Sequence, residues 1–398
     1  MKWPKACLGD VAQVVSGATP KSSVSHYWDG DIPWITPADL SNLARKEVSA
    51  TSRRITAAGL SSCSASLLPA RSVLFSSRAP IGHVAINAVP MATNQGFKSF
   101  VPDHKILSPD FLYWWLKSNK SYLQSLGRGA TFKEVSKEIV ESIEIPLPPL
   151  DEQRRIAAIL DKAADLHSLS KRADQLAIDL RVSRLRQLLN SEVSHRSKSQ
   201  YVPLSDLIRG KPNNGIFRKN PEYQDPDKGG LPVVWVEQLF RGEVLELSAC
   251  KKLDATNAEI AKYGLTNGDI LFCRSSLKPE GIAKPNIYMG ADGQAIFECH
   301  LIRISPDPAK INPIFLNECL NLPEIRAEAR RLSKTSTMTT IDQDGILAIA
   351  VPLPPLHIQE QFAQDFALFQ YLSTRRRKSN HAIGLLTASL ASIQLGKT

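Results

Sequence analysis

Ile145-Pro-Leu-Pro-Pro-Leu150 is the stretch that decides the fold, because it occurs a second time as Val351-Pro-Leu-Pro-Pro-Leu356. The spacing is 351 − 145 = 206 residues, and Gln153 and Gln359 follow the two motifs at the same spacing. Proline cannot continue a helix, so each motif is predicted to end one structural element and to stiffen the start of the next.

Further matches lie upstream of both motifs and keep the same order along the chain. They are Leu8-Gly-Asp-Val11 with Leu204-Ser-Asp-Leu207, Val73-Leu-Phe75 with Ile270-Leu-Phe272, and Ser108-Pro-Asp-Phe-Leu112 with Asn312-Pro-Ile-Phe-Leu316. The offset drifts from 204 − 8 = 196 to 312 − 108 = 204, which short loop insertions would explain. The chain is therefore interpreted as one unit of about 200 residues used twice.

The first part of each unit has the pattern of a mixed domain. Short β-branched or aromatic runs at 31–35, 72–76 and 81–86 are bounded by Gly, Pro and Ser, as is typical of strands. Ser108 is predicted as a helix N-cap with Pro109 in the first turn, and Asn312 with Pro313 opens the matching helix.

The second part of each unit is predicted to be one long helix. Ile159, Leu166, Ala173 and Leu180 recur every seven residues, and neither Pro nor Gly occurs between 151 and 190. A helix of about 40 residues is roughly 60 Å long, which suits a coiled coil better than a small core. Since an apolar stripe must be covered, we expect the two long helices to pack antiparallel against each other.

The expected fold class is therefore α+β. Two similar globular domains, 1–150 and 197–356, are separated by an antiparallel two-helix coiled coil formed by 151–196 and 357–398. A pseudo-two-fold axis would relate the two halves of this internal repeat.

Composition narrows the class of protein. The net charge of +10 favours a polyanionic partner such as nucleic acid. No apolar run is long enough to cross a bilayer, the first residues lack the apolar stretch of a secretory signal, and the six cysteines are scattered without a C-x-x-C pair. A reducing cytoplasmic location is expected, without a disulfide framework or a structural zinc site.

Catalytic signatures are missing from the sequence. There is no G-x-G-x-x-G after a strand and no H-E-x-x-H, and Gly396-Lys-Thr398 lacks the glycine that a P-loop needs at Ala391. The eight histidines show no metal-ligand spacing. We therefore expect no catalytic residues, no metal and no cofactor bound by this chain, which favours a binding or specificity protein.

Positive and small polar side chains cluster after the predicted strands, in loops of both units. Arginine can bind guanine O6 and N7, amides can bind adenine edges, and hydroxyls can bind bases or phosphates. The loops differ between the units, Arg78-Ala-Pro80 against Arg274-Ser-Ser276, so two copies could read two different sequences. The predicted DNA-binding residues are Lys21, Ser76, Ser77, Arg78, Asn94, Gln95, Lys98, Arg128, Thr131, Lys133, Arg218, Lys219, Arg274, Ser275, Ser276, Lys278, Lys334 and Thr335.

Taken together, two variable globular parts, each followed by a proline motif, a Gln and a long helix, resemble the specificity subunit of type I restriction–modification systems over essentially the whole chain. The first motif continues as Asp151-Glu152-Gln153-Arg154, whereas the second reads His357-Ile-Gln359 and lacks the acidic pair. Thr93-Asn-Gln-Gly-Phe97 is also of the kind seen in the target-recognition domains of that family.

The resemblance implies a non-catalytic subunit whose two target-recognition domains each read one half of a bipartite double-stranded DNA site. The helices would act as a spacer and as the docking surface for two methylation subunits that carry S-adenosylmethionine, with Glu152, Gln153, Arg154 and Gln359 as docking residues. Restriction subunits using ATP and Mg²⁺ could join to cleave DNA. The alternatives are a coiled-coil scaffold, another DNA-binding protein without methyltransferase partners, or a self-sufficient methyltransferase or nuclease with unusual motifs.

Overall fold

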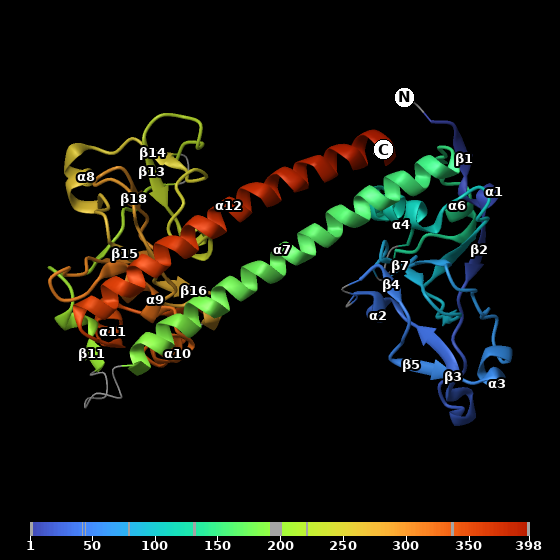
Figure 1. Cartoon of the computed structure of the whole chain (residues 1–398), viewed down its shortest axis with the longest axis horizontal. Helices are drawn as coiled ribbons and strands as arrows, with labels where there is room; N and C mark the ends of the chain where they lie inside the picture. Colours follow the sequence, from blue (N-terminus) through green and yellow to red (C-terminus); the bar gives the residue numbers. More distant parts are fainter. Residues whose placement is uncertain are drawn as a thin grey trace. The chain divides into compact units, whose positions relative to one another are not determined.

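The computed structural model describes residues 3–41, 43, 45–78, 80–129, 133–191, 201–219, 222–335 and 338–395 (Figure 1). The chain divides into two compact units. Unit 1 consists of Met1–Ser170 and Lys378–Thr398, and unit 2 consists of Lys171–Arg377. Each unit contains an α+β domain and parts of two long helices, in agreement with the predicted fold class.

Unit 1 is built around a sheet with the order β2-β9-β6-β7-β4. Its central strand, the apolar run Val73–Phe75, is fully buried, as expected for a strand covered on both faces. A second sheet has the order β5-β3-β8, and the ends of the domain are joined by the antiparallel pair β1-β10. The strands are β1 (Lys5–Cys7), β2 (Ala12–Ser16), β3 (Trp28–Ile35), β4 (Glu47–Val48), β5 (Arg53–Ile55), β6 (Val73–Phe75), β7 (Val84–Asn87), β8 (Ala92–Thr93), β9 (Lys98–Pro102) and β10 (Glu144–Pro146).

The principal helix of the unit 1 domain begins where the sequence predicts. The Ser108 side chain accepts a hydrogen bond from the Phe111 N–H (3.5 Å), Pro109 follows the cap, and Phe111 and Trp115 are buried in the core. The helical segments are α1 (Leu8–Val11), η1 (Ser25–Tyr27), α2 (Pro37–Ser41), α3 (Ala57–Ser61), α4 (Pro109–Ser118), α5 (Lys120–Ser125) and α6 (Lys137–Glu141).

Unit 2 repeats this topology in the same chain order. The larger sheet is β12-β19-β15-β17, the second sheet is β14-β13-β18, and the pair β11-β22 again joins the ends of the domain. The parallel pair β13-β18 matches the parallel pair β3-β8. The elements are β11 (Tyr201–Pro203), η3 (Leu204–Asp206), β12 (Asn213–Asn214), β13 (Leu231–Val234), η5 (Val236–Phe240), β14 (Lys252–Leu253), α8 (Asn257–Tyr263), β15 (Ile270–Cys273), β16 (Ser275–Ser276), η6 (Pro279–Gly281), β17 (Pro285–Ile287), β18 (Ile296–Phe297), β19 (Leu301–Ile304), α9 (Pro313–Leu320), α10 (Pro323–Arg331), β20 (Lys334–Thr335), β21 (Thr339–Thr340), α11 (Gln343–Leu347) and β22 (Ala350–Pro352).

A buried glutamine fixes each long helix to the domain that precedes it. Gln153 accepts a hydrogen bond from the Ser108 N–H (2.9 Å) and donates to the carbonyls of Ile106 (2.9 Å) and Pro148 (2.8 Å). Gln359 accepts from the Asn312 N–H (2.8 Å) and donates to the Pro354 carbonyl (2.8 Å). The two glutamines therefore satisfy backbone groups inside the fold, and the prediction that they dock a partner is wrong because their side chains are buried.

The two long helices are α7 (Leu150–Ser191) and α12 (Leu356–Leu395). Within unit 2 they run antiparallel. Arg184 of α7 pairs with Asp365 of α12 (2.7 Å), and Asp174 of α7 pairs with Arg376 of α12. The second pair therefore lies ten residues earlier along α7 but eleven residues later along α12. Within unit 1, Asn380 donates to the Ser170 hydroxyl, which continues the same direction. Among the described residues, we find no helix with the length and apolarity needed to cross a lipid bilayer.

The leucine stripe of α7 is largely left open in this antiparallel pair, although we expected it to be covered. Leu166, Leu169, Leu176 and Leu180 are 50–65% exposed. In unit 2 the buried positions of α7 are Leu185 and Leu188, which share a core with Phe362 and Phe366 of α12. Polar pairs join the middle of the two helices, so the heptad leucines are left facing solvent.

Candidate nucleic-acid interface

Three segments that are distant in sequence meet in unit 2 just after β15. The Arg274 N–H donates to the His300 carbonyl (2.9 Å), and the Arg274 carbonyl accepts from the Ile341 N–H (3.0 Å). The next residues form β16, which pairs with β21, and β21 pairs with β20. We call this meeting point of residues 274–276, 298–300, 334–335 and 338–342 the unit 2 junction.

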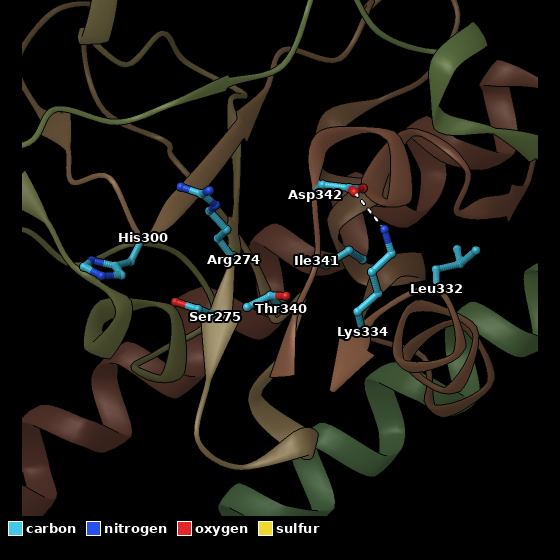
Figure 2. Close-up of a pocket in the computed structure, with 8 residues that line it drawn as sticks. All are labelled: Arg274, Ser275, His300, Leu332, Lys334, Thr340, Ile341 and Asp342. Carbon is cyan, nitrogen blue, oxygen red and sulfur yellow. Dashed lines mark ion pairs between the residues drawn. The ribbon is translucent and has the colours of Figure 1, made fainter. Parts of the chain in front are cut away.

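A cavity of about 330 Å³ opens at the unit 2 junction and is lined by Arg274, Ser275, His300, Leu332, Lys334, Thr340, Ile341 and Asp342 (Figure 2). The Lys334 ammonium lies 3.8 Å from the Asp342 carboxylate, and its side chain is 87% exposed. Arg274 is exposed, and no acidic side chain of the described residues lies within ion-pair distance of it. Figure 2 shows Arg274 extending away from the Lys334–Asp342 pair. This arrangement offers cationic and hydroxyl donors to phosphates and base edges.

Unit 1 has the same backbone junction. The Ser77 N–H donates to the Gly96 carbonyl (2.8 Å), the Ser77 carbonyl accepts from Val135 (3.0 Å), and Arg128 exchanges two backbone hydrogen bonds with Glu134 (both 2.9 Å). Ser77 therefore occupies the position of Arg274. By the same backbone bonds, Arg78 corresponds to Ser275 and Arg128 corresponds to Lys334. Arg78 and Arg274, which were expected to be equivalent, are therefore displaced from each other by one residue.

The side chains of the unit 1 junction make a different set of contacts. Glu134 lies 3.4 Å from the Lys98 ammonium and 3.8 Å from the Arg78 guanidinium. Asn94 accepts from the Gly96 N–H (2.9 Å), and Gln95 accepts from the Thr19 hydroxyl. Among the predicted residues here, Arg128 and Lys133 are exposed, whereas Arg78 and Lys98 already have an acidic neighbour.

Two of the predicted DNA-binding serines are buried. The Ser76 hydroxyl donates to the Pro80 carbonyl (2.7 Å) and accepts from the His83 N–H (2.8 Å). The Ser77 hydroxyl donates to the Gly96 carbonyl (3.2 Å). Both hydroxyls therefore hold the loop together from inside and are not part of its exposed surface.

The remaining predicted residues lie in several places. Arg218 pairs with Glu259 and with Glu222 (3.2 Å), so its charge is largely compensated. The Ser276 hydroxyl donates to the Lys278 carbonyl (2.7 Å), and the Thr335 hydroxyl lies 3.2 Å from that of Thr339. Lys21, Lys219 and Lys278 are exposed without lining the cavity, and Thr131 lies outside the described residues.

The other predicted docking residues lie in the first turns of α7. Glu152 pairs with Arg155 (2.7 Å), and Arg154 lies 3.3 Å from Asp151. Arg154 is exposed, so it remains available to a partner, and its docking role stays a prediction.

Sequence reasoning missed His300, Thr340 and Asp342, which line the cavity. The repeat contained the signal for His300: an offset of 204 residues places His300 opposite Gly96, inside the run Thr93–Phe97 that had been singled out. The turn reads Asn94-Gln95-Gly96 in unit 1 and Glu298-Cys299-His300 in unit 2, so no identical residue aligns the two turns.

Charged clusters fix each domain to α7. In unit 1, the Lys46 ammonium lies 2.7 Å from both Asp110 of α4 and Asp161 of α7, and Trp114 donates to Asp161 (2.9 Å). In unit 2, Arg181 of α7 lies 2.8 Å from the buried carboxylate of Glu318. Because 318 − 114 = 204, Trp114 and Glu318 occupy equivalent positions and reach α7 by different chemistry.

Comparisons with known proteins agree with this organisation. Residues 1–176 match the family model described as a type I restriction modification DNA specificity domain. The type I restriction enzyme MjaIX specificity subunit of Methanocaldococcus jannaschii is 37% identical over 176 residues, covering 44% of this chain and 40% of the relative. The HindI specificity subunit of Haemophilus influenzae is 29% identical over 198 residues, covering 48% of this chain. The alignments with these two relatives span only 40% and 42% of the relatives' own length.

Other similarities extend over the whole chain. The MjaVIII specificity subunit of the same archaeon is 23% identical over 396 residues, covering 96% of this chain and 89% of the relative. The crystal structure of a type I restriction–modification S subunit from M. genitalium shares the fold at a TM-score of 0.62 and 14% identity, covering 100% of this chain and 96% of that one. Over residues 1–176 the chain therefore matches a type I restriction modification DNA specificity domain, and over its whole length it is similar to a type I specificity subunit and shares the fold of a solved S subunit.

Proposed function

We propose that this chain is a DNA sequence-specificity subunit in which each unit reads one half of a bipartite double-stranded DNA site. The observation that carries the proposal is that the two junctions have the same backbone hydrogen bonds but different side chains. A shared backbone presents the variable residues in the same geometry, and residues that differ can contact different bases. The net charge of +10 supports a polyanionic partner.

The chain itself catalyses nothing in this proposal. Methylation subunits supply S-adenosylmethionine and the adenine-methylating chemistry, and restriction subunits, where present, supply ATP- and Mg²⁺-dependent cleavage. One of the solved structures that shares the fold concerns complex assembly of a type I restriction–modification system, at a TM-score of 0.53 and 17% identity, covering 100% of this chain and 98% of that one. That description applies to the neighbour and is extended to this chain as a proposal.

The exposed leucines of α7 support the docking part of the proposal. Leu166, Leu169, Leu176 and Leu180 are large, apolar and at least half exposed to solvent, and Leu368 and Leu372 of α12 are 59% and 52% exposed. Rows of exposed apolar side chains on a helix are typical of surfaces that another protein covers. We propose that two methylation subunits cover these rows, while Glu152 and Arg154 offer charged contacts beside them.

The decisive test compares the methylated adenines of a host with and without the gene. Loss of one split adenine motif on deletion is the expected result, and an unchanged methylome would contradict the proposal. A coiled-coil scaffold without a DNA role is distinguished by titrating the reconstituted complex with DNA at increasing salt. Phosphate contacts release counterions, so log K must fall steeply with log salt, whereas a flat dependence would favour the scaffold.

A further inference from the structure

Three side chains of metal-ligating type are consecutive in a tight turn of unit 2. Glu298, Cys299 and His300 follow β18, and the Leu301 N–H donates to the Glu298 carbonyl (3.1 Å) and closes the turn. One ligand atom from each residue lies within 4.8 Å of the other two. His300 Nδ1 is 2.7 Å from Glu298 Oε2 and 3.7 Å from Cys299 Sγ.

The equivalent turn of unit 1 shows what the turn alone requires. There Asn94 accepts from the Gly96 N–H (2.9 Å), as Glu298 Oε2 accepts from the His300 N–H (2.9 Å). One acceptor oxygen therefore satisfies the turn. Glu298 brings a second oxygen, Oε1, which is buried and has no hydrogen-bond partner among the described residues, in a side chain that is only 3% exposed. A buried carboxylate oxygen without a partner is costly, and a cation held by this carboxylate would offset that cost.

The geometry fits a small divalent transition metal. A tetrahedral zinc with ligand bonds of about 2.0–2.3 Å separates its ligand atoms by about 3.3–3.7 Å. The Sγ–Nδ1 distance of 3.7 Å already matches, and the Glu298–His300 pair needs to open by less than one ångström. Thiolate, imidazole and carboxylate are together the donor set that zinc accepts. His300 is 59% exposed, so the site is open to solvent on that side.

We propose that Glu298, Cys299 and His300 bind one Zn²⁺ ion, with a water molecule in the fourth position. Binding converts the Cys299 thiol to a thiolate, and its proton passes to solvent. The inference goes beyond the proposed function and stands on unit 2 alone. It also departs from the expectation that this chain binds no metal. That expectation was based on the absence of spaced ligand motifs such as C-x-x-C and H-E-x-x-H, whereas these three residues are consecutive in one turn.

The metal would act on the candidate interface by fixing the turn. The His300 carbonyl holds the Arg274 backbone, and the His300 ring lines the same cavity as Arg274 (Figure 2). A metal bound to His300 Nδ1 would restrict the conformations of the turn before any ligand binds. Binding at the junction would then cost less conformational entropy, and such preorganisation raises affinity. Unit 1 has no such set in its corresponding turn, Asn94-Gln95-Gly96, so the device would belong to one recognition surface only.

The test uses the full-length, tag-free chain, stripped with a chelator and titrated with Zn²⁺ against a chromophoric competitor. One equivalent is expected to bind. Co²⁺ in place of Zn²⁺ should give the near-ultraviolet thiolate-to-cobalt charge-transfer band, which reports a metal–sulfur bond without any mutation. Absence of this band, or no binding in the competition, would overturn the proposal.

Variants then assign the ligands. Cys299→Ser, His300→Gln and Glu298→Gln should each weaken Zn²⁺ binding at least tenfold, and Cys299→Ser should abolish the cobalt band. Gln at 298 keeps an oxygen that can accept from the His300 N–H, so this variant separates metal binding from turn formation. Cys63→Ser is the matched control, since Cys63 is a partly buried free thiol of unit 1 and should leave affinity unchanged. Wild-type affinity in Cys299→Ser, with circular dichroism matching that of the control, would also overturn the proposal.

Discussion

Units 1 and 2 share their framework but differ at almost every side chain that the shared junction presents. Both have the pair of end strands, the parallel strand pair, a capped helix with proline in its first turn and a buried glutamine. At the junction, Ser77 stands where unit 2 has Arg274, Glu134 where it has Thr340, and Gly96 where it has His300. The difference indicates that the fold depends on shared buried contacts, and that the junction side chains can vary without loss of the fold.

The same contrast holds where each domain meets α7. Unit 1 uses Lys46 between Asp110 and Asp161, whereas unit 2 uses Arg181 against Glu318. At position 110 of unit 1 the helix carries an aspartate, and at the equivalent 314 of unit 2 it carries an isoleucine. Each unit therefore fixes its orientation on the helix with its own set of charges, although the backbone is common.

The largest expected effect concerns the feature that both units share. Gln153→Leu should destabilise unit 1 by about 3 kcal/mol or more, because the Ser108 N–H and the carbonyls of Ile106 and Pro148 lose their partner in a buried site. Gln359→Leu should cost about 2 kcal/mol, since within the described part of the chain its side chain bonds only Asn312 and Pro354. Urea unfolding followed by circular dichroism measures both.

Arg154→Ala is the control for these variants, because Arg154 is exposed one residue after Gln153. It should change stability by less than about 0.5 kcal/mol. Equal and small losses in all three variants would contradict the role assigned to the buried glutamines.

A second prediction separates the two junctions. Arg274→Ala should weaken recognition of one half-site by roughly 1–3 kcal/mol, since Arg274 is exposed and no acidic side chain in the described ranges pairs with it, which leaves the guanidinium available for a bidentate base contact. Arg78→Ala should have a smaller effect on the other half-site, because Glu134 already compensates that guanidinium. Binding of the reconstituted complex to DNA with single-base changes in each half-site provides the measurement.

Arg209→Ala is the matched control in unit 2, since Arg209 is exposed and does not line the cavity. If Arg274→Ala weakened binding equally on specific and unrelated DNA, Arg274 would be a phosphate contact, and the assignment of base reading to the junction would fail at this residue.

A third prediction uses pH to distinguish the charge clusters. Burial alone would raise the pKa of Asp110, but the hydrogen bonds and charges of Lys46 and Arg71 outweigh it and hold this pKa below its ordinary value. The stabilisation from Asp110 is therefore complete above the ordinary pKa of 3.8 and is lost as the pH falls through the lowered one. Asp110→Asn should cost about 1 kcal/mol at neutral pH, after allowance for partial exposure, and should remove this acid dependence.

In unit 2 the corresponding pH effect lies on the alkaline side. Burial, helped by Arg326 and opposed by Glu318, lowers the pKa of Lys284 to about 8. The unfolded chain binds more protons than the folded one between about 8 and 10.5, so stability should rise with pH across that range. Lys284→Met should abolish the rise, and urea midpoints measured from pH 3 to 10 test both units. A variant that kept its parent's pH profile would refute the assignment for that cluster.

The smallest effect on stability is expected at the exposed leucines. Leu166 and Leu372 are equivalent, because 372 − 166 = 206, and they are 50% and 52% exposed. Leu166→Gln and Leu372→Gln should each change unfolding by less than about 0.5 kcal/mol, yet each should reduce co-purification of a methylation subunit. Ser183→Gln, at an exposed polar position of α7, should leave co-purification unchanged. Unaltered assembly in both leucine variants would place the docking surface elsewhere.

The sequence by itself determined the duplication, the α+β class and the two long helices. These properties depend on local signals that repeat: the proline motif, the glutamine after it, and the cap at Ser108 and Asn312. The prolines and the caps act on backbone groups a few positions away, so their effect follows from local spacing. The glutamine recurs at the same place in both copies, but its role as a buried hydrogen-bond partner did not follow from the sequence.

Only the tertiary structure decided which side chains face outward. The heptad leucines of α7 were expected to pack and are exposed, whereas Ser76, Ser77, Gln153 and Gln359 were expected to bind partners and are buried. The junction itself joins residues 274, 300 and 341, whose contacts bridge gaps of 26 and 67 residues, since 300 − 274 = 26 and 341 − 274 = 67. Periodicity reports that a helix has an apolar face, but burial depends on which other surface covers that face, and that is fixed only when distant segments pack together.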